Sequence, residues 1–168
     1  ALFKNKKILI TAGPTYESID PVRFIGNYSS GKMGIRLAEV AASMGAEVTI
    51  VLGPTHLKLN ADKRISLHNV VSAEEMLRVV ESKLAQFDYF ILAAAVADYR
   101  PESPSLEKIK KSEEILNLKL IKNPDIAAFI GKNKQSHQKL IGFALETQNI
   151  IGNAQAKLNK KSMDMIVI

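Results

Sequence analysis

The stretch at residues 26–34, GNYSSGKMG, has the composition of a phosphate-binding loop. Its glycines and Lys32 match the P-loop pattern, but Met33 stands where a Ser or Thr hydroxyl should bind Mg²⁺. A P-loop also joins a strand directly to a helix, whereas a long polar segment precedes this stretch. We therefore reject a P-loop. What remains is a helix start at Ser29 and Ser30, whose backbone N–H groups either favour an anion or are satisfied by ordinary capping.

The loop before this helix carries two side chains that suit a negatively charged ligand. Arg23 offers a planar pair of donors for a phosphate or carboxylate, and the Asn27 amide can donate to a developing oxyanion. Either residue alone is compatible with a solvated loop. Together, beside a helix start, they favour a binding role.

The segment AAAVADYRP combines small residues with one carboxylate. It ends a continuous apolar run that predicts a buried central strand, so Ala94 and Ala95 would let a ligand approach the backbone closely. Asp98 follows, where a carboxylate can bind a ribose hydroxyl or a metal-bound phosphate. A turn aspartate without a ligand is the alternative.

Lysines form the third group of candidate residues. Their ammonium groups suit the screening of a triphosphate and of a leaving pyrophosphate. Single lysines are usually only solvated, but a set on one side of a sheet would indicate an anion. The set comprises Lys108, Lys110, Lys111, Lys122, Lys157 and Lys161.

Composition narrows both the class of protein and the class of ligand. The chain has 168 residues, 46% of them hydrophobic and 24% charged, which predicts one globular domain over residues 1–168. The formal charge of +6 indicates an anionic partner, and the dispersed lysines favour phosphorylated small molecules over nucleic acid. The absence of cysteine excludes a disulfide scaffold, a Cys-zinc site and a thiol nucleophile, and the three His lack a common metal-binding spacing. No apolar run reaches the roughly 20 residues of a membrane helix, so we expect a cytoplasmic protein without a membrane partner.

Buried apolar segments alternate with amphipathic ones along the chain. Strands are predicted at 6–11, 46–54, 64–70, 88–99, 116–122, 139–145 and 163–168, the last as a buried strand, and helices at 32–44, 73–87, from Pro124 and at 150–161. Ser72 and Glu75 form a capping box, and Asn123-Pro124-Asp125 also fits a helix N-terminus with Pro at the first position. The alternation predicts an α/β class with a Rossmann-like, mainly parallel sheet and helices on both faces. Ligands bind such sheets at the carboxyl ends of the strands, near the point where the strand order reverses.

A nicotinamide dinucleotide is the second ligand to consider, because the first strand ends in TAGPT. No G-x-G-x-x-G turn follows, and the second strand ends in VLGPT without the acidic residue that binds a ribose. A protein can have this Rossmann-like sheet and bind a ligand other than a nicotinamide dinucleotide.

Several of these blocks occur together and in order. ITAGPT, DPVRFIGNYSSGKMG, AAAVADYRP, EKIKK, KNPDI, GFALET and the paired lysines resemble the bacterial phosphopantothenoylcysteine synthetase family, the ligase half of bifunctional coenzyme A biosynthesis proteins. The resemblance covers essentially the whole chain. It implies a CTP-dependent ligase in which the carboxylate of 4′-phosphopantothenate attacks the α-phosphate, pyrophosphate leaves, and the cysteine amine attacks the acyl-cytidylate. The substrate supplies the nucleophile, so the lack of cysteine in the chain is no obstacle.

The resemblance also implies roles by position. Asn27 would contact the acyl-cytidylate, Arg23 would bind phosphopantothenate together with Asn27, Ala94 and Ala95, and Lys108 would lie near the reacting phosphate. Asn27 and Lys108 are the predicted catalytic residues. The implied nucleotide site consists of Asp98, Lys108, Lys122, Asn123, Pro124, Asp125, Phe143, Lys157 and Lys161. Mg²⁺ is expected with CTP rather than in a metal site of the protein.

The sequence also departs from the family pattern. Tyr28 stands where a His is frequent. The last portion of the synthetase domain and the flavin-dependent decarboxylase half that usually precedes it are missing, so we expect a piece of a longer, homodimeric protein. A nicotinamide-dependent reductase on the same winding and an inactive nucleotide-binding module remain as alternatives.

Overall fold

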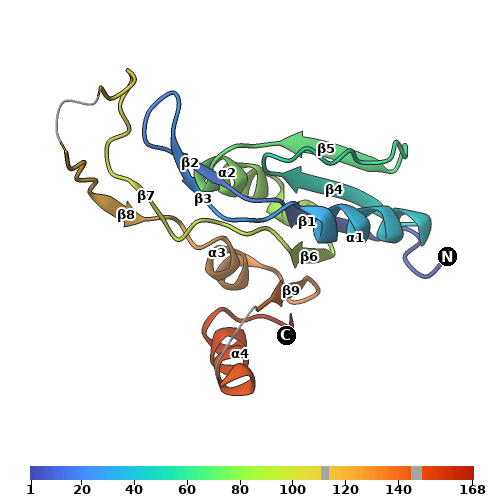
Figure 1. Ribbon diagram of the computed structural model, residues 1–168. Coiled ribbons are helices and arrows are strands. Elements are labelled where there is room, and N and C mark those ends of the chain that lie inside the picture. The colour runs from blue at the N-terminus through green and yellow to red at the C-terminus, as the bar shows by residue number, and fades with distance from the viewer. Residues whose placement is uncertain (111–113, 145–148) are drawn as a thin grey trace.

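A six-stranded parallel sheet forms the centre of the computed structural model, which describes residues 1–110, 114–144 and 149–168 (Figure 1). The strands are β1 (Lys7–Ala12), β4 (Glu47–Leu52), β5 (Ile65–Asn69), β6 (Tyr89–Leu92), β9 (Lys139–Phe143) and β10 (Met165–Val167). They lie in the order β10-β9-β6-β1-β4-β5, and each adjacent pair is parallel. This is the doubly wound order, with its reversal between β1 and β6. The predicted fold class is confirmed.

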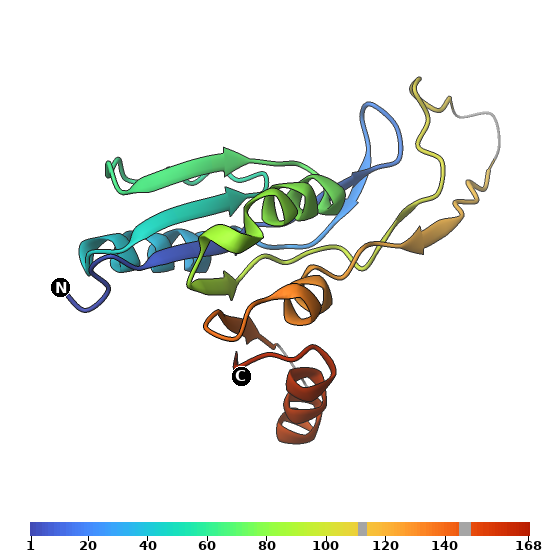
Figure 2. The ribbon, with the colours of Figure 1, turned by 180° about the vertical axis from the view of Figure 1, so that it is seen from behind.

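Helices cover both faces of this sheet (Figures 1 and 2). They are α1 (Lys32–Ser43), α2 (Ala73–Lys83), α3 (Ile126–Asn133) and α4 (Ile150–Lys160), with a short 3-10 turn at Leu84–Gln86 after α2. On one face Ile10 packs in a buried cluster with Ala38 of α1. On the other, Leu9 shares a cluster with Met76 of α2 and Ile130 of α3. Alternate residues of β1 therefore face opposite layers, because successive side chains of a strand point to opposite sides.

Two glycines fix how α1 meets β1. Gly31 occupies the N-cap position with φ 76°, a left-handed conformation that glycine adopts without strain. At Gly34 a Cβ atom would lie 2.3 Å from the Cβ of Ala12, so only glycine allows the helix to approach the strand this closely. The predicted start at Ser29 and Ser30 is thus shifted to Gly31, although the two hydroxyls accept from the N–H groups of Gly31 and Lys32 at 3.3 and 3.4 Å.

The other helix starts agree in part with the sequence. The Ser72 hydroxyl accepts from the Glu75 N–H at 3.2 Å, which confirms the predicted cap of α2. The start of α3 was predicted wrongly: Asp125 is its N-cap, and Pro124 precedes the helix rather than occupying its first position.

Two antiparallel strand pairs project past the carboxyl ends of the sheet and lie side by side (Figures 1 and 2). One pairs β2 (Tyr16–Ser18) with β3 (Phe24–Gly26), the other β7 (Tyr99–Pro101) with β8 (Leu120–Lys122). The predicted strand at 116–122 is therefore shorter and outside the main sheet, and the strand predicted at 88–99 ends at Leu92. Pairing with β7 satisfies the backbone of β8, so β8 does not need the main sheet.

The last strand, β10, was predicted to be buried and is instead an exposed edge. Its side chains Met165 and Val167 are 55% and 41% exposed. Met165 lies beside Ile141 in the register. Its side chain is therefore on the same face of the sheet as the β1 residues that α1 covers. Within the described residues α1 lies over β1 and β4 and leaves this face of β10 open.

No helix in the described part of the chain combines the length and the hydrophobicity that crossing a membrane requires.

Candidate functional site

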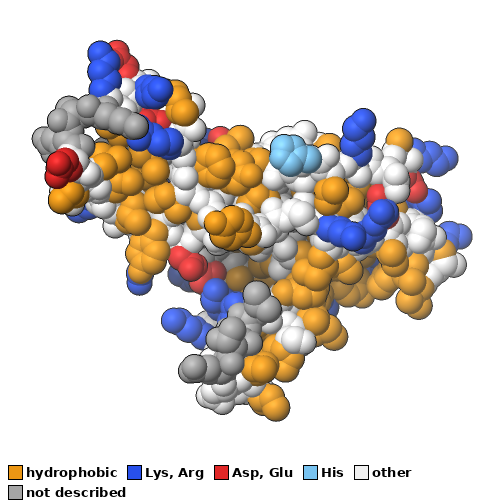
Figure 3. All heavy atoms as spheres, viewed as in Figure 1, with side chains coloured by type: hydrophobic (Ala, Val, Ile, Leu, Met, Phe, Trp, Pro, Cys, Tyr) orange, Lys and Arg blue, Asp and Glu red, His pale blue; other side chains and the backbone are white. Residues whose placement is uncertain are grey.

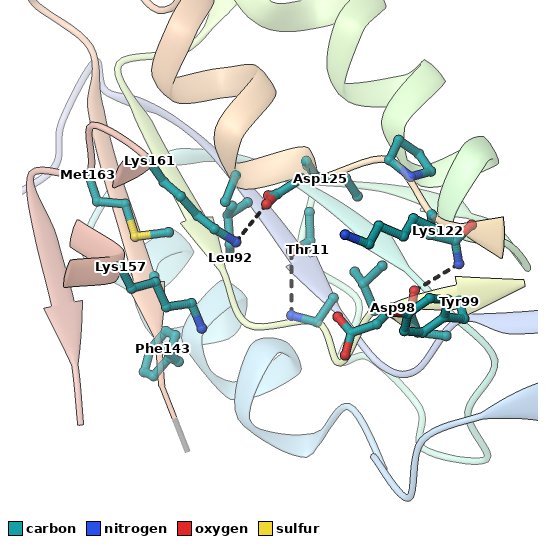
Figure 4. A pocket seen from close by; sticks show the side chains of 18 residues that line it. Thr11, Leu92, Asp98, Tyr99, Lys122, Asp125, Phe143, Lys157, Lys161 and Met163 are labelled. Carbon is teal, nitrogen blue, oxygen red and sulfur yellow. Dashed lines mark hydrogen bonds and ion pairs between the residues drawn. The ribbon is translucent and has the colours of Figure 1, made fainter. Parts of the chain in front are cut away.

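A cavity of about 490 Å³ opens at the carboxyl ends of β1, β6 and β9, beside the reversal of strand order. Its volume is typical of small-molecule sites, which span about 300–1,000 Å³. The predicted residues that line it are Ala94, Asp98, Lys122, Asn123, Pro124, Asp125, Phe143, Lys157 and Lys161 (Figure 4). Every residue of the predicted nucleotide site except Lys108 thus meets in one cavity.

Two lysines give the cavity its positive charge. Lys122 comes from the end of β8 and Lys157 from α4, and their ammonium groups point into the cavity from opposite sides (Figure 4). Neither ammonium has a hydrogen-bond or ion-pair partner among the described residues. A ligand with several phosphates could be held between them, since a cation and a phosphate form strong charge-assisted hydrogen bonds.

Asp98 and Phe143 supply the other contacts that a nucleotide needs. The Asp98 carboxylate is exposed and has no partner within residues 1–110, 114–144 and 149–168, so it is free to accept from a ribose hydroxyl. The Phe143 ring lies beside Lys157 and offers an apolar surface (Figure 4). Thr11 and Met163 also line the cavity and were not predicted; only the place of Thr11 near the end of a strand could have indicated it.

Asp125 and Lys161 are paired with each other rather than free. The Lys161 Nζ lies 2.8 Å from Asp125 Oδ2, while Asp125 Oδ1 accepts from the Ala128 N–H at 3.0 Å. Burial raises the pKa of Asp125, but hydrogen bonds from Lys161 and Ala128 outweigh it and leave the pKa below its ordinary value. The pair joins the start of α3 to the end of α4 and so shapes one wall of the cavity.

Asn123 is also held by the protein. Its Nδ2 donates to the Ala97 carbonyl at 2.8 Å, and its Oδ1 accepts from Arg100 at 3.3 Å. Arg100 donates further to the Lys122 carbonyl at 2.8 Å and forms an ion pair with Glu74 at 2.9 Å. Arg100, which was not among the predicted site residues, thereby fixes the backbone that carries Lys122.

Asn27 reaches the alanine segment from the loop before α1. Its Nδ2 donates to the carbonyls of Ala95 and Val96 at 3.1 and 3.2 Å. The structure thus brings Asn27 and Ala95 together, although neither lines the cavity. Both amide hydrogens are engaged, which leaves Oδ1 as the free atom of this side chain.

Arg23 is engaged as well. It pairs with the Asp20 carboxylate through Nη2 and donates from the same atom to the Ile109 carbonyl at 3.0 Å. Lys108 is exposed beside Ile109, and neither Arg23 nor Lys108 lines the cavity. Lys111, another lysine of the predicted set, lies outside the described residues.

Among the described residues, no group of three or more His, Cys, Asp or Glu side chains could hold a metal ion. Asp98 is the cavity carboxylate that remains free to contact an ion arriving with a ligand.

The chain was compared with known protein families, proteins and structures. Residues 3–168 match the family described as the DNA/pantothenate metabolism flavoprotein C-terminal domain. A cysteine/cysteine sulfinic acid decarboxylase from an unknown prokaryotic organism is 50% identical over 164 residues, which are 98% of this chain and 45% of that protein. The coenzyme A biosynthesis bifunctional protein CoaBC of Haemophilus influenzae is 47% identical over 159 residues, 95% of this chain and 39% of that protein.

A solved structure agrees with these relatives. The crystal structure of the C-terminal domain of a CoaBC protein matches with a TM-score of 0.86 and 44% identity, over 99% of this chain and 78% of that one. The chain spans less than half the length of the two curated relatives. The family match nevertheless runs over nearly the entire chain, and this chain therefore belongs to the family of C-terminal domains of DNA/pantothenate metabolism flavoproteins, which confirms the resemblance drawn from its motifs.

Proposed function

We propose that this domain joins 4′-phosphopantothenate to cysteine with CTP, as a step of coenzyme A biosynthesis. The carboxylate oxygen of phosphopantothenate attacks the α-phosphorus of CTP, the bond to pyrophosphate breaks, and an acyl-cytidylate forms. The amine of cysteine then attacks the acyl carbon, CMP leaves, and the amine loses a proton. The observation that carries this proposal is the cavity, into which the ammonium groups of Lys122 and Lys157 point from opposite sides and which Asp98 also lines.

Four of the cavity residues have parts in the proposed binding step. The two ammonium groups hold the triphosphate and stabilise the charge of the departing pyrophosphate. Asp98 accepts from a ribose hydroxyl or contacts Mg²⁺ carried by the triphosphate, an ion that neutralises phosphate charge. Ala94 lets the ligand lie close to the backbone at the end of β6. Lys108, Arg23 and Asn27 lie outside this cavity. Lys108 is assigned to the reacting phosphate, and Asn27 to the acyl-cytidylate.

The relatives support a role in coenzyme A biosynthesis more strongly than they support the CTP-dependent reaction steps. CoaBC of Haemophilus influenzae is named as a bifunctional coenzyme A biosynthesis protein, and this chain covers 39% of it. We therefore also propose that a decarboxylase half is fused to this domain in the native protein, and that the protein acts in the cytoplasm.

The fold argues against the nicotinamide alternative. In a dinucleotide-binding fold the first strand turns directly into a helix whose N-terminus binds the pyrophosphate. Here β2 and β3 intervene between β1 and α1. β4, the next strand of the main sheet after β1 along the chain, also ends at Leu52 before Gly53 and Pro54, without an acidic side chain for the ribose.

Thermal unfolding with CTP, ATP and NADPH, each with Mg²⁺, separates the candidates. A ligand that binds only the folded state stabilises it by RT ln(1 + [L]/Kd), about 2.7 kcal/mol at a hundredfold excess over Kd. We expect CTP to raise the melting temperature most. Stabilisation by NADPH and not by CTP would refute the ligase, and stabilisation by CTP without pyrophosphate release in the full-length protein would favour the inactive module.

A homodimer is a further part of the proposal. Both projecting strand pairs and the segments beside them expose large apolar side chains, namely Val22, Phe24, Leu106, Ile115, Leu116 and Leu120. Apolar side chains gather over this part of the molecule in Figure 3. Such an exposed surface favours association with a second copy.

A further inference from the structure

The loop at residues 19–23 holds the segment at residues 105–109 by contacts between residues far apart in the chain. The Ser105 N–H donates to the Ile19 carbonyl at 2.9 Å. The Ile109 N–H donates to Asp20 Oδ2 at 3.1 Å, and the Ile109 carbonyl accepts from Arg23 at 3.0 Å. Both backbone groups of Ile109 are thus bound to one Asp-Arg pair.

Asp20 is the centre of this arrangement. Its side chain is fully enclosed, with 0% exposed, and is saturated with donors. Oδ1 accepts from the N–H groups of Val22 and Arg23, both at 2.9 Å, and Oδ2 accepts from Ile109 and from the Arg23 guanidinium. The Arg23 guanidinium holds the pKa of Asp20 well below its ordinary value, burial opposes this shift, and the backbone donors reinforce it. A buried carboxylate with every partner in place is costly to disturb.

Lys108 immediately precedes the residue that is held. Its side chain is exposed and has no ion pair among the described residues. β3 follows this loop, and Asn27, which donates a hydrogen bond to the Ala95 carbonyl, comes directly after β3. The Asp20-Arg23 pair therefore touches the backbone next to one predicted catalytic residue, Lys108, and β3 connects it to the other, Asn27.

We propose that Asp20 is a positioning residue for Lys108, acting with Arg23 to fix the Lys108 backbone relative to the β2–β3 hairpin, which leads to Asn27. This inference rests on the proposed function, because it takes Lys108 to act at the reacting phosphate of CTP. It also assigns Arg23 differently from the resemblance: its guanidinium completes the hold on Ile109 instead of contacting phosphopantothenate. Misplacing a catalytic group by about 1 Å can cost about a hundredfold in rate, so the hold on Ile109 has a direct effect on turnover.

Asp20→Asn in the full-length protein tests the proposal. The variant keeps the size of the side chain but loses the charge that binds Arg23 and weakens the bond from Ile109. We expect hydrogen exchange of a peptide covering residues 105–110 to speed up, and acyl-cytidylate formation to slow about 10- to 100-fold. CTP affinity, measured by calorimetry, should change less than about twofold because Asp20 does not line the cavity.

A matched control is available in the same chain. Asp62 also accepts from the backbone N–H and the guanidinium of an arginine close by in sequence, Arg64, but it binds no distant segment among the described residues. Asp62→Asn should leave both exchange at 105–110 and the rate unchanged. If Asp20→Asn fails to fold, Arg23→Lys serves instead, because lysine keeps a cation for Asp20 while losing the geometry that reaches Ile109.

Lys108→Gln distinguishes positioning from a general structural role. If Asp20 acts through Lys108, adding Asp20→Asn to the Lys108→Gln protein should slow acyl-cytidylate formation by less than about a further twofold. Equal slowing in both backgrounds, or unchanged exchange at 105–110, overturns the inference and leaves the proposed function standing. A normal rate for Lys108→Gln alone removes Lys108 from the proposed mechanism, and this inference with it.

Discussion

Lys157 and Lys160 lie on the same helix, but only Lys157 lines the cavity. Lys157→Gln removes a charge that faces the proposed triphosphate, and a hydrogen bond to a charged group contributes about 1.5–3 kcal/mol. We therefore expect CTP affinity to fall about 10- to 100-fold, measured by calorimetry with Mg²⁺. Lys160→Gln removes the same charge outside the cavity and should change affinity less than about twofold. Equal losses in the two variants would mean that net charge, and not this site, attracts the nucleotide.

Asn27 offers a second test at the level of single residues. Asn27→Asp keeps the shape but places a carboxylate against the carbonyls of Ala95 and Val96, which can only repel it. Since Asn27 does not line the cavity, CTP affinity should stay within about threefold while acyl-cytidylate formation in a single turnover falls at least about tenfold. Asn27→Ser, which retains a small donor, is the milder comparison. A large loss of CTP affinity with normal intermediate formation would place Asn27 in the nucleotide site instead.

At the scale of elements, Gly34 controls how closely α1 packs on β1. Gly34→Ala would place a Cβ atom 2.3 Å from the Cβ of Ala12, and overpacking of this kind costs about 1–3 kcal/mol. Chemical denaturation should show that loss. Gly152→Ala, in α4, is the matched control: the nearest atoms belong to the Asn149 side chain, which can move, so stability should hold or rise. Unchanged stability in Gly34→Ala would show that α1 can shift away from the sheet.

The link between α3 and α4 should respond to acid. The pKa of Asp125 is lowered in the folded protein, so its carboxylate stabilises the fold above the ordinary pKa of 3.8, and this stabilisation is lost as the pH falls below that value. Asp125→Asn keeps a good helix cap but loses the ion pair with Lys161, and should cost at most about 1 kcal/mol at pH 7 because the pair is partly exposed. Melting curves between pH 7 and pH 3 should converge for the two proteins as the pH falls. A constant difference between them would exclude this ion pair as the source of the variant's loss of stability.

At the scale of the whole molecule, the prediction concerns a homodimer that forms through the projecting strand pairs. Leu106 is 94% exposed on the segment after β7, and Ile151 is 77% exposed on α4. If the proposed homodimer forms through the projecting pairs, Leu106→Asp should weaken it at least about fivefold without affecting folding, whereas Ile151→Asp should not. Sedimentation velocity over a range of concentrations measures both. A monomeric wild-type protein in its full-length form would contradict the homodimer itself.

Sequence alone determined the winding, the family and half of the residues that line the cavity. Apolar runs alternating with helical patterns leave few arrangements other than a parallel sheet with helices on both faces, and such a sheet gathers the strand ends at one edge. Asp98 follows β6 and Phe143 ends β9, so their meeting at that edge could be expected from their order in the chain. Lys122 ends β8, which lies outside the main sheet, so its place in the cavity could not be expected in this way. Lys157 joins them because α4 returns across the same edge.

Tertiary structure decided which of these polar groups are free and which are already bound. Arg23 and Ile109 are 86 residues apart, and no local pattern indicates that the guanidinium would bind this carbonyl rather than a substrate. The same holds for Asn27 with Ala95 and for Asp125 with Lys161, because a side chain's partner depends on which segments pack beside it. The tertiary structure also placed β10 at an open edge, although its apolar residues predicted a buried strand. Periodicity shows that a strand has an apolar face, but only the packing of the other elements determines whether that face is covered.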